Sequence, residues 1–253
     1  TEKAGDGEDV VSILDMKADL DDKILKIGEK ISIRRFEKVT ADVVASYIHG
    51  GGRIGVLVAG NGASDDAAKE ALTNIAMQIA AMNPQYISRD EISADELAKM
   101  KEITIDSALN DPFSLPKPVL SKLIEKAVAG VWSAEDVAIY EEKKSNMNFL
   151  PNFLSKEAKA QLAEIACADK EEISGNKIFS GLVEGRISKQ MKEICLLDQV
   201  YVKAEDGKQT VAAYLKSVNP ALKIAKFVRF EVGEGMEKKN EDFAAEVAKQ
   251  MNV

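Results

Sequence analysis

The sequence predicts an α+β fold, in which helices and strands share one chain. Residues 54–58 form a short β-branched apolar run closed by glycines at 60 and 62, which is typical of a buried strand that ends in a turn. Residues 224–232 alternate apolar and polar side chains, which is typical of an amphipathic strand. Between these segments, apolar residues recur at helical spacing over several long stretches. Both kinds of element are therefore expected.

The composition is that of an ordinary globular protein of one or two domains. Of 253 residues, 45% are hydrophobic and 30% are charged, and no apolar run approaches the roughly 18 residues of a membrane span. The formal charge of -8 argues against broad binding to nucleic-acid phosphates, which needs clustered Lys and Arg. Residues 1–9 lack the basic and apolar regions of an export signal. We therefore expect a cytoplasmic protein without direct nucleic-acid or membrane contacts.

The cysteines and the single histidine provide no obvious metal ligands. Cys167 and Cys195 match no metal-binding or redox spacing and are expected to be reduced thiols. With one histidine in the chain, no metal site is expected. Arg34 and Arg35 form a basic doublet in a predicted strand. Because neighbouring strand residues point to opposite faces, we expect one arginine to be solvated and the other to pair with a carboxylate.

The first predicted elements are a helix and a strand. Apolar residues at 20, 24 and 27 predict a short amphipathic helix, and Gly28 follows as its C-cap. Residues 31–34 then alternate apolar and polar, which predicts a strand. The pattern of residues 42–46 is ambiguous.

A glycine cluster with the only histidine, His49, precedes the buried strand. Gly50, Gly52 and Gly55 satisfy G-x-G-x-x-G, the dinucleotide fingerprint. In that fingerprint the glycines follow a strand and open a helix that holds a pyrophosphate, whereas here they precede strand-forming residues. The pattern therefore favours a bend with positive φ before a central strand.

A long alanine-rich helix follows this strand. Ser64, Asp65 and Asp66 provide an N-cap and negative charge at its start. The helix is expected to end at Asn83, because the residue before Pro84 is disfavoured in helical geometry. Its buried stripe is predicted to consist of Leu72, Ile75, Ala76, Ile79 and Met82.

The next hundred residues are mainly helical by pattern. Capping boxes at residues 88–91 and 93–96 predict the start of a helix that continues through residue 108. Three prolines mark residues 110–118 as a hinge or hairpin tip. Further helices are then expected, including one capped by Ser133 and one that begins at Ser155.

Residues 178–194 carry a strong apolar stripe at helical spacing. If this helix runs back along the helix of residues 93–109, the two form an antiparallel, coiled-coil-like arm. The heptads are few, so a packed helical subdomain is the alternative.

The last part of the chain returns to strand patterns. Residues 199–204 are β-like, and an Asp-Gly turn and a short helix opened by Thr210 follow. After the amphipathic strand, a final helix is predicted from Asn240, and its apolar face includes Phe243. That apolar face needs a surface to cover it, on this chain or on a partner.

No constellation of residues points to catalysis. With one histidine, a Ser-His-Asp arrangement would have to use His49, and the sequence has no G-x-S-x-G elbow and no P-loop. Paired carboxylates occur at helix starts or on polar faces, where solvated charge explains them. We expect neither catalytic residues nor a cofactor, and the remaining features are typical of a protein that binds another protein.

Five stretches of the sequence are recognisable as long motifs, and they are residues 26–35, 46–58, 74–81, 227–235 and 242–247. Taken together and in this order, they closely resemble bacterial elongation factor Ts. The resemblance is collinear over residues 20–110 and 176–251. Several long motifs in one order are much more specific than any single pattern.

The resemblance implies a guanine-nucleotide exchange factor for elongation factor Tu, which acts in translation elongation. In the family, the factor distorts the magnesium and phosphate site of Tu so that GDP leaves, and GTP then displaces the factor. It makes and breaks no covalent bond. The resemblance therefore implies a cytoplasmic protein that is not an enzyme and holds no cofactor.

The resemblance also implies antiparallel sheets packed with helices in a two-subdomain core, with a projecting antiparallel helical arm and a C-terminal helix. Residues 111–175 match nothing in the short form of that arm, and we interpret them as an insertion that enlarges its tip. The implied divisions are a remnant of the N-terminal core subdomain (1–39), the C-terminal core subdomain (40–92 and 192–235), the arm (93–191) and a C-terminal helical module (236–253).

Five positions match family residues at the partner interface or close to it. Ile27 and Gly28 match a position that touches the G domain of Tu, and His49 matches an interface histidine. Val202 matches an apolar contact towards a β-barrel domain, and Phe243 would face either the partner or the core. Without the resemblance, Ile27 and Gly28 are explained as a helix cap, and His49 as a core residue that makes a hydrogen bond.

The sequence also departs from the family pattern. The family begins with a small helical domain and a T-D-F-V-A motif whose Asp-Phe pair wedges into the G domain, and neither occurs in this sequence. We therefore expect a truncated form. Two alternatives stay open: a nucleotide-dependent enzyme that uses the bend of Gly50 to Gly55, and a structural scaffold that forms a homodimer through the arm.

Overall fold

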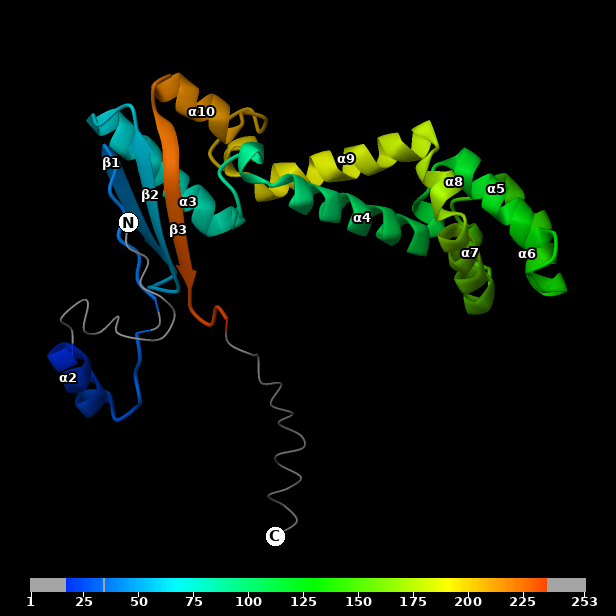
Figure 1. The fold of residues 1–253 in the computed structure, drawn as a ribbon, viewed down its shortest axis with the longest axis horizontal. Helices are drawn as coiled ribbons and strands as arrows, with labels where there is room; N and C mark the ends of the chain where they lie inside the picture. The colour runs from blue at the N-terminus through cyan, green and yellow to red at the C-terminus, as the bar shows by residue number, and fades with distance from the viewer. Residues whose placement is uncertain (1–16, 34, 236–253) are drawn as a thin grey trace, which may run out of the picture. The chain divides into compact units, whose positions relative to one another are not determined.

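A computed structural model of the protein describes residues 17–33 and 35–235. The described residues divide into two compact units, one formed by the described residues up to 83 together with residues 201–235, and the other by residues 84–200. We call them the sheet unit and the helical unit. The described residues contain nine α-helices and a three-stranded antiparallel sheet (Figure 1), which confirms the predicted α+β class. The helix predicted from Asn240, with Phe243, lies outside the described residues.

The first unit is built on a sheet with the strand order β1-β2-β3. β1 (Val43–His49) and β2 (Ile54–Asn61) form a hairpin, and β3 (Lys223–Glu231) pairs with the other edge of β2. Residues 50–52 have φ values of 59°, 66° and 100°, which side chains rarely allow, so the hairpin turn requires glycine. The predicted glycine bend before a central strand is confirmed.

Helix α3 (Asp66–Met82) covers one face of this sheet (Figure 1). It begins where Asp65 accepts a 2.7 Å hydrogen bond from the Ala68 amide, and it ends at Asn83, whose φ of 47° is left-handed. Its buried stripe includes Leu72, Ile75, Ala76 and Ile79. The prediction that Met82 belongs to this stripe is wrong, because Met82 occupies the last turn and is exposed.

The two faces of the sheet differ in burial. Ala45, Val56 and Val58 lie on the face covered by α3 and are almost completely buried. Burial of such apolar side chains is the main free-energy term that holds α3 on the sheet. Because side chains alternate along a strand, Leu57 and Phe230 lie on the other face, where they are half-buried.

The segment before the sheet contains α2 (Lys17–Ile27), whose own residues are all exposed or half-buried. The Gly28 amide donates a 2.8 Å hydrogen bond to the Ile24 carbonyl, and Gly28 has a φ of 79°, so the predicted glycine C-cap is confirmed. The strand predicted at residues 31–34 is wrong for residues 31–33, and residue 34 lies outside the described residues. Residues 31–33 join none of the three strands, and alternation alone does not supply a pairing partner.

The segment of residues 199–204 also differs from the prediction, because Val200 forms only an isolated bridge and residues 202–203 form a turn. The Val202 amide donates a 2.7 Å hydrogen bond to Oε1 of Gln78, a buried side chain of α3, and so has no strand partner. The turn at Asp206 and the N-cap of Thr210 on α10 (Val211–Val218) are as predicted.

The second unit, residues 84–200, is helical. Helices α4 (Ala94–Asn110) and α9 (Lys177–Ile194) lie side by side and run in opposite directions, since the Tyr86 carbonyl accepts a hydrogen bond from the Leu196 amide where the chain enters and leaves (Figure 1). The helices between them are α5 (Lys117–Val128), α6 (Ala134–Lys143), α7 (Lys156–Ala168) and α8 (Lys170–Ser174).

One buried apolar cluster runs through this unit, from Ala108 to Cys195. Phe179 is part of it, and Trp132 donates a 2.9 Å hydrogen bond from Nε1 to the Ala158 carbonyl. The predicted alternative of a packed helical subdomain therefore describes this cluster. The expected hinge at residues 110–118 consists of one 3-10 turn and the start of α5. None of the described helices is long and apolar enough to cross a membrane.

The N-caps of α6 and α7 share one buried carboxylate. Asp136 accepts hydrogen bonds from Ser133 Oγ (2.7 Å), the Ser155 amide (2.9 Å) and Ser155 Oγ (3.0 Å). Ser133 and Ser155 in turn accept from the first-turn amides of their own helices, so both predicted caps are confirmed. Asp136 therefore fixes the start of one helix against the start of the other.

Replacing Gly62 with alanine is expected to destabilise the sheet unit by about 1–2 kcal/mol. Gly62 has a φ of 92°, and a Cβ there would lie 2.1 Å from the Ala221 carbonyl oxygen, so the backbone would have to move. Urea denaturation followed by circular dichroism measures the loss. Gly181→Ala is the control: a Cβ there meets open space on α9, and we expect a gain of about 0.5–1 kcal/mol. A Gly62→Ala variant as stable as the wild type would contradict the prediction.

Candidate functional site

The glycine cluster forms a hairpin turn and not a phosphate loop. Gly50 and Gly52 lie in the tight turn between β1 and β2, and Gly55 is already within β2. The residues that follow them form a strand, whereas a phosphate loop of this kind leads into a helix whose N-terminus holds the phosphate. Among the described residues, no group of three or more His, Cys, Asp or Glu side chains is placed to hold a metal ion.

His49 is the last residue of β1 and is exposed at the base of this turn. Its Nδ1 lies 2.9 Å from the Tyr47 hydroxyl oxygen, and its carbonyl accepts a hydrogen bond from the Gly52 amide. The two rings lie with their centroids 5.8 Å apart. The alternative explanation of His49 as a core residue therefore does not fit, because its hydrogen-bond partner lies with it at the surface.

Ile27 and Gly28 end helix α2. The hydrogen bond of the Gly28 amide accounts for Gly28 as a helix cap. A Cβ built at Gly28 would meet no other atom within 4 Å. The Ile27 side chain is 59% exposed. The cap therefore explains the glycine and leaves the isoleucine without a buried environment.

Val202 lies in a loop that is fixed before it by Tyr201 and after it by the turn at Asp206. Tyr201 is buried and stacks on Tyr214 with ring centroids 4.1 Å apart, and burial raises the pKa of its hydroxyl. Asp206 closes the following turn by accepting from the Lys208 and Gln209 amides, and these hydrogen bonds lower its pKa. Val202 itself is 47% exposed. The loop thus holds an apolar side chain at the surface.

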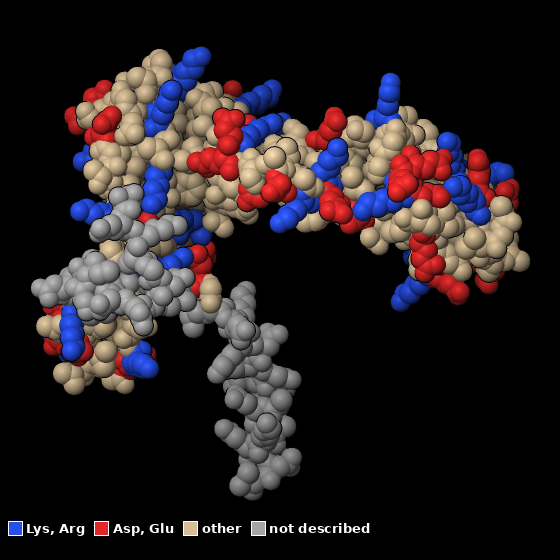
Figure 2. All heavy atoms as spheres, in the orientation of Figure 1, with Lys and Arg blue, Asp and Glu red and all other residues tan. Residues whose placement is uncertain are grey.

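The structure describes four of the five predicted site residues, and Phe243 lies outside the described part. The four occupy three separate elements: the end of α2, the end of β1 and the loop that leads to α10. None of the four is a lining residue of the cavities described at residues 119–176, 201–217 and 113–151. On the face shown in Figure 2, Lys and Arg side chains are interspersed with Asp and Glu.

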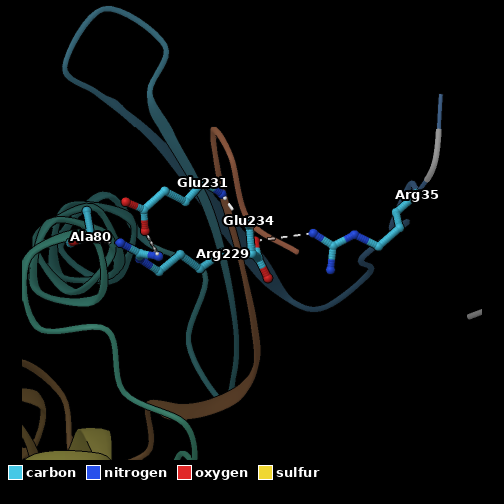
Figure 3. A network of polar contacts seen from close by, with 5 residues as sticks. All are labelled: Arg35, Ala80, Arg229, Glu231 and Glu234. Carbon is cyan, nitrogen blue, oxygen red and sulfur yellow. Dashed lines mark hydrogen bonds and ion pairs between the residues drawn. The ribbon is translucent and has the colours of Figure 1, made fainter. Parts of the chain in front are cut away.

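A network of ion pairs at the end of β3 was not predicted (Figure 3). Arg35 donates to Glu234 Oε2 over 3.2 Å, and Arg229 donates to Glu231 over 2.7 Å. Sequence reasoning predicted that one arginine of the 34–35 doublet pairs with a carboxylate, and Arg35 is that residue; the position of Arg34 is not described. Glu234 lies 199 residues away, so no local spacing could have identified it.

The described residues combine helices with an antiparallel sheet, and Ile27, His49 and Val202 are exposed on it or beside it. The sequence profile of the family described as Elongation factor TS matches residues 8–138 and 144–234. The chain belongs to the elongation factor Ts family, as the sequence resemblance predicted.

Curated relatives give the same result. The chain is 36% identical over 260 residues to elongation factor Ts of Clostridioides difficile (strain 630), a match that covers 98% of this chain and 66% of the relative. It is 36% identical to that of Clostridium botulinum (strain Eklund 17B / Type B), over 90% of this chain and 57% of the relative. It is 35% identical to that of Halothermothrix orenii, over 94% and 58%. The chain thus spans less than two thirds of the length of these relatives.

Proposed function

We propose that this chain is the partner-binding core of a guanine-nucleotide exchange factor for elongation factor Tu. The observation that carries the proposal is the exposure of Ile27, His49 and Val202, which match family contact positions and are held at the surface by defined local structure. The chain acts by binding and makes no covalent bond. It works in the cytoplasm, where its partner and GDP are present.

The proposed mechanism is negative coupling between two ligands of one partner. If the factor weakens the binding of GDP to elongation factor Tu, then GDP must weaken the binding of the factor by the same ratio. Contacts from Ile27 and Gly28 to the G domain, together with a contact from Val202 to a β-barrel domain, would let the factor distort one domain while it stays attached to another. GTP then displaces the factor from the empty site.

We also propose the domain assignment that the resemblance implies. The C-terminal core subdomain (40–92 and 192–235) takes in the sheet together with residues 84–92 and 192–200, which the compact units assign to the helical unit. Residues 1–39 precede it as a remnant of the N-terminal subdomain. The enlarged arm (93–191) lies within the helical unit of residues 84–200. Residues 236–253 are assigned to the C-terminal helical module, with Phe243. The shared apolar cluster supports a packed insertion within residues 111–175.

The proposal predicts a complex with nucleotide-free elongation factor Tu that dissociates when excess GDP is added. Binding by fluorescence anisotropy and release of fluorescent GDP measure the two sides of the coupling. A complex that is insensitive to GDP would contradict exchange. Saturable nucleotide binding to this chain alone in equilibrium dialysis would instead support the enzyme alternative, and a dimer mass by light scattering would support the scaffold.

Two contact variants sharpen this test. Val202→Asp places a charge in the proposed apolar contact, and His49→Ala removes the imidazole; each is expected to weaken binding at least about tenfold. Val131→Asp is the matched control, because Val131 is 43% exposed, close to the 47% of Val202, but lies in the helical unit. We expect Val131→Asp to bind like the wild type. Equal binding by Val202→Asp and Val131→Asp would remove Val202 from the interface.

A further inference from the structure

Residues 35–37 lie against β3, on the face of the sheet opposite to α3, and we call them the strap. The guanidinium carbon of Arg35 lies 4.7 Å from the centroid of the Phe230 ring, and its Nη2 lies 3.2 Å from Glu234 Oε2. Glu37 accepts a 2.7 Å hydrogen bond from Lys226 Nζ. Each end of the strap is therefore fastened to β3 or to the residues that follow it.

The charges fix the direction of the strap. The strap is positive at Arg35 and negative at Glu37, while the β3 segment is positive at Lys226 and negative at Glu234. A strap laid in the opposite direction would bring like charges together, which is unfavourable. The two ion pairs therefore specify one antiparallel placement.

The strap is also connected to the core through the end of β3 (Figure 3). Glu234 accepts a hydrogen bond from the Glu231 amide, Glu231 pairs with Arg229, and Arg229 Nη2 lies 3.4 Å from the Ala80 carbonyl oxygen in α3. Arg35 is the main reason that the pKa of Glu234 is below its ordinary value. The strap thus ends on a carboxylate that the core already orients.

No single contact in the strap is strong. Arg35 and Glu234 are each 43% exposed, and an ion pair at such a surface contributes little by itself. The stacking of Arg35 on Phe230 and the second ion pair act on the same three residues, so the ordering cost is shared among three contacts. Both ends must be broken to release the strap.

The strap shortens the segment that carries Ile27. Arg35 lies eight residues after Ile27, whereas Val43, the first residue of β1, lies sixteen residues after it. With the strap in place, an extended chain lets Ile27 reach about 27 Å from its anchor; with the strap released, the reach is about 54 Å. Doubling a linker lowers the effective concentration at its end about threefold.

We propose that Arg35 and Glu37 are positioning residues, which hold the strap on β3 so that α2 presents Ile27 to the same partner molecule that contacts His49. This inference rests on the proposed function for its partner. It assigns no contact with the partner to Arg35 or Glu37 themselves. Their effect is to restrict where α2 can be found before binding.

The test uses charge reversal at constant net charge. R35E/E37K places like charges opposite Glu234 and Lys226, and adding K226E/E234R restores opposite charges at both ends. We expect R35E/E37K to increase amide hydrogen exchange over residues 29–40 and to weaken binding to nucleotide-free elongation factor Tu at least about threefold. The fourfold variant should recover most of both effects. K38A removes a charge from an exposed residue beside the strap and should change neither.

The two readouts separate the two proposals. Equal hydrogen exchange in R35E/E37K and the wild type would overturn the strap, whatever the partner does. Faster exchange with unchanged binding would overturn the positioning role. If the wild type does not bind elongation factor Tu at all, the proposed function is wrong, and hydrogen exchange still decides whether the strap is held by its charges.

Discussion

Replacing Phe179 with alanine is expected to destabilise the helical unit by about 3–5 kcal/mol. Phe179 is 1% exposed in the first turns of α9, within the cluster that joins the helices of residues 84–200. The loss combines the transfer free energy of the ring with the cavity that it leaves. Trp132 is the only tryptophan of the chain and lies in the same cluster, so its fluorescence during urea denaturation reports on this unit.

The neighbouring residue provides the control for this prediction. Ile178 is 54% exposed although its position in the sequence stripe predicted burial. We expect Ile178→Ala to change the free energy of unfolding by no more than about 0.5 kcal/mol. Equal urea midpoints for Phe179→Ala and Ile178→Ala would show that the cluster does not stabilise the unit as described.

The second large effect is expected at Asp136. Asp136→Ala removes the acceptor of three hydrogen bonds and leaves the Ser155 amide without that partner, so we expect a loss of about 2–4 kcal/mol. The same urea and Trp132 measurement applies. Glu135→Ala is the control, because Glu135 is an exposed acid in the same first turn. A loss no greater than that of Glu135→Ala would contradict the shared cap.

The contribution of Asp136 should depend on pH. Burial by itself raises the pKa of this carboxyl, but the hydrogen bonds from Ser155 and Ser133 outweigh it, and the pKa lies below its ordinary value. A lowered pKa in the folded state stabilises the fold above the unfolded-state value of about 3.9, and this contribution is lost as pH falls through the folded-state pKa. The stability difference between the wild type and Asp136→Ala should therefore be full at pH 6 and shrink below about pH 4.

Helix boundaries were the most predictable part of the fold. Ser93, Ser133, Ser155 and Thr210 all cap helices as expected, because a cap joins a side chain to an amide three residues away and needs no information about the rest of the chain. The C-cap at Gly28 was predictable for the same reason, because its amide bonds to a carbonyl four residues earlier.

Strands were less predictable, because a strand requires a partner that can lie anywhere in the sequence. Residues 31–33 have a suitable pattern but pair with no strand, and residues 199–204 form only an isolated bridge at Val200. The Val202 amide is satisfied by the side chain of Gln78 instead. The predicted buried stripe of α3 was wrong only at Met82, which is the last residue of the helix and is exposed.

The candidate site shows the same division between local and distant information. The glycine turn and the exposure of His49 follow from a short stretch of sequence, whereas the pairing of Arg35 with Glu234 joins residues near opposite ends of the chain. The family could be recognised from motifs, since several long matches in one order carry information that no single residue does. No motif of this kind covers residues 111–175, so the sequence predicts helices there but not their role.

Backbone hydrogen bonds close the helical unit where the chain enters and leaves it, and this bears on how the length of the unit can vary within the family. Four hydrogen bonds join Gln85, Tyr86 and Ile87 to residues 194–197, so the two chain ends of that unit are held together at a fixed separation. Whatever lies beyond this closed stem can grow, shrink or be exchanged without pulling on its ends, and longer loops add only slowly to the entropy of closure. Helices can therefore be inserted or replaced beyond this stem, by evolution or by design, while the rest of the structure stays unchanged.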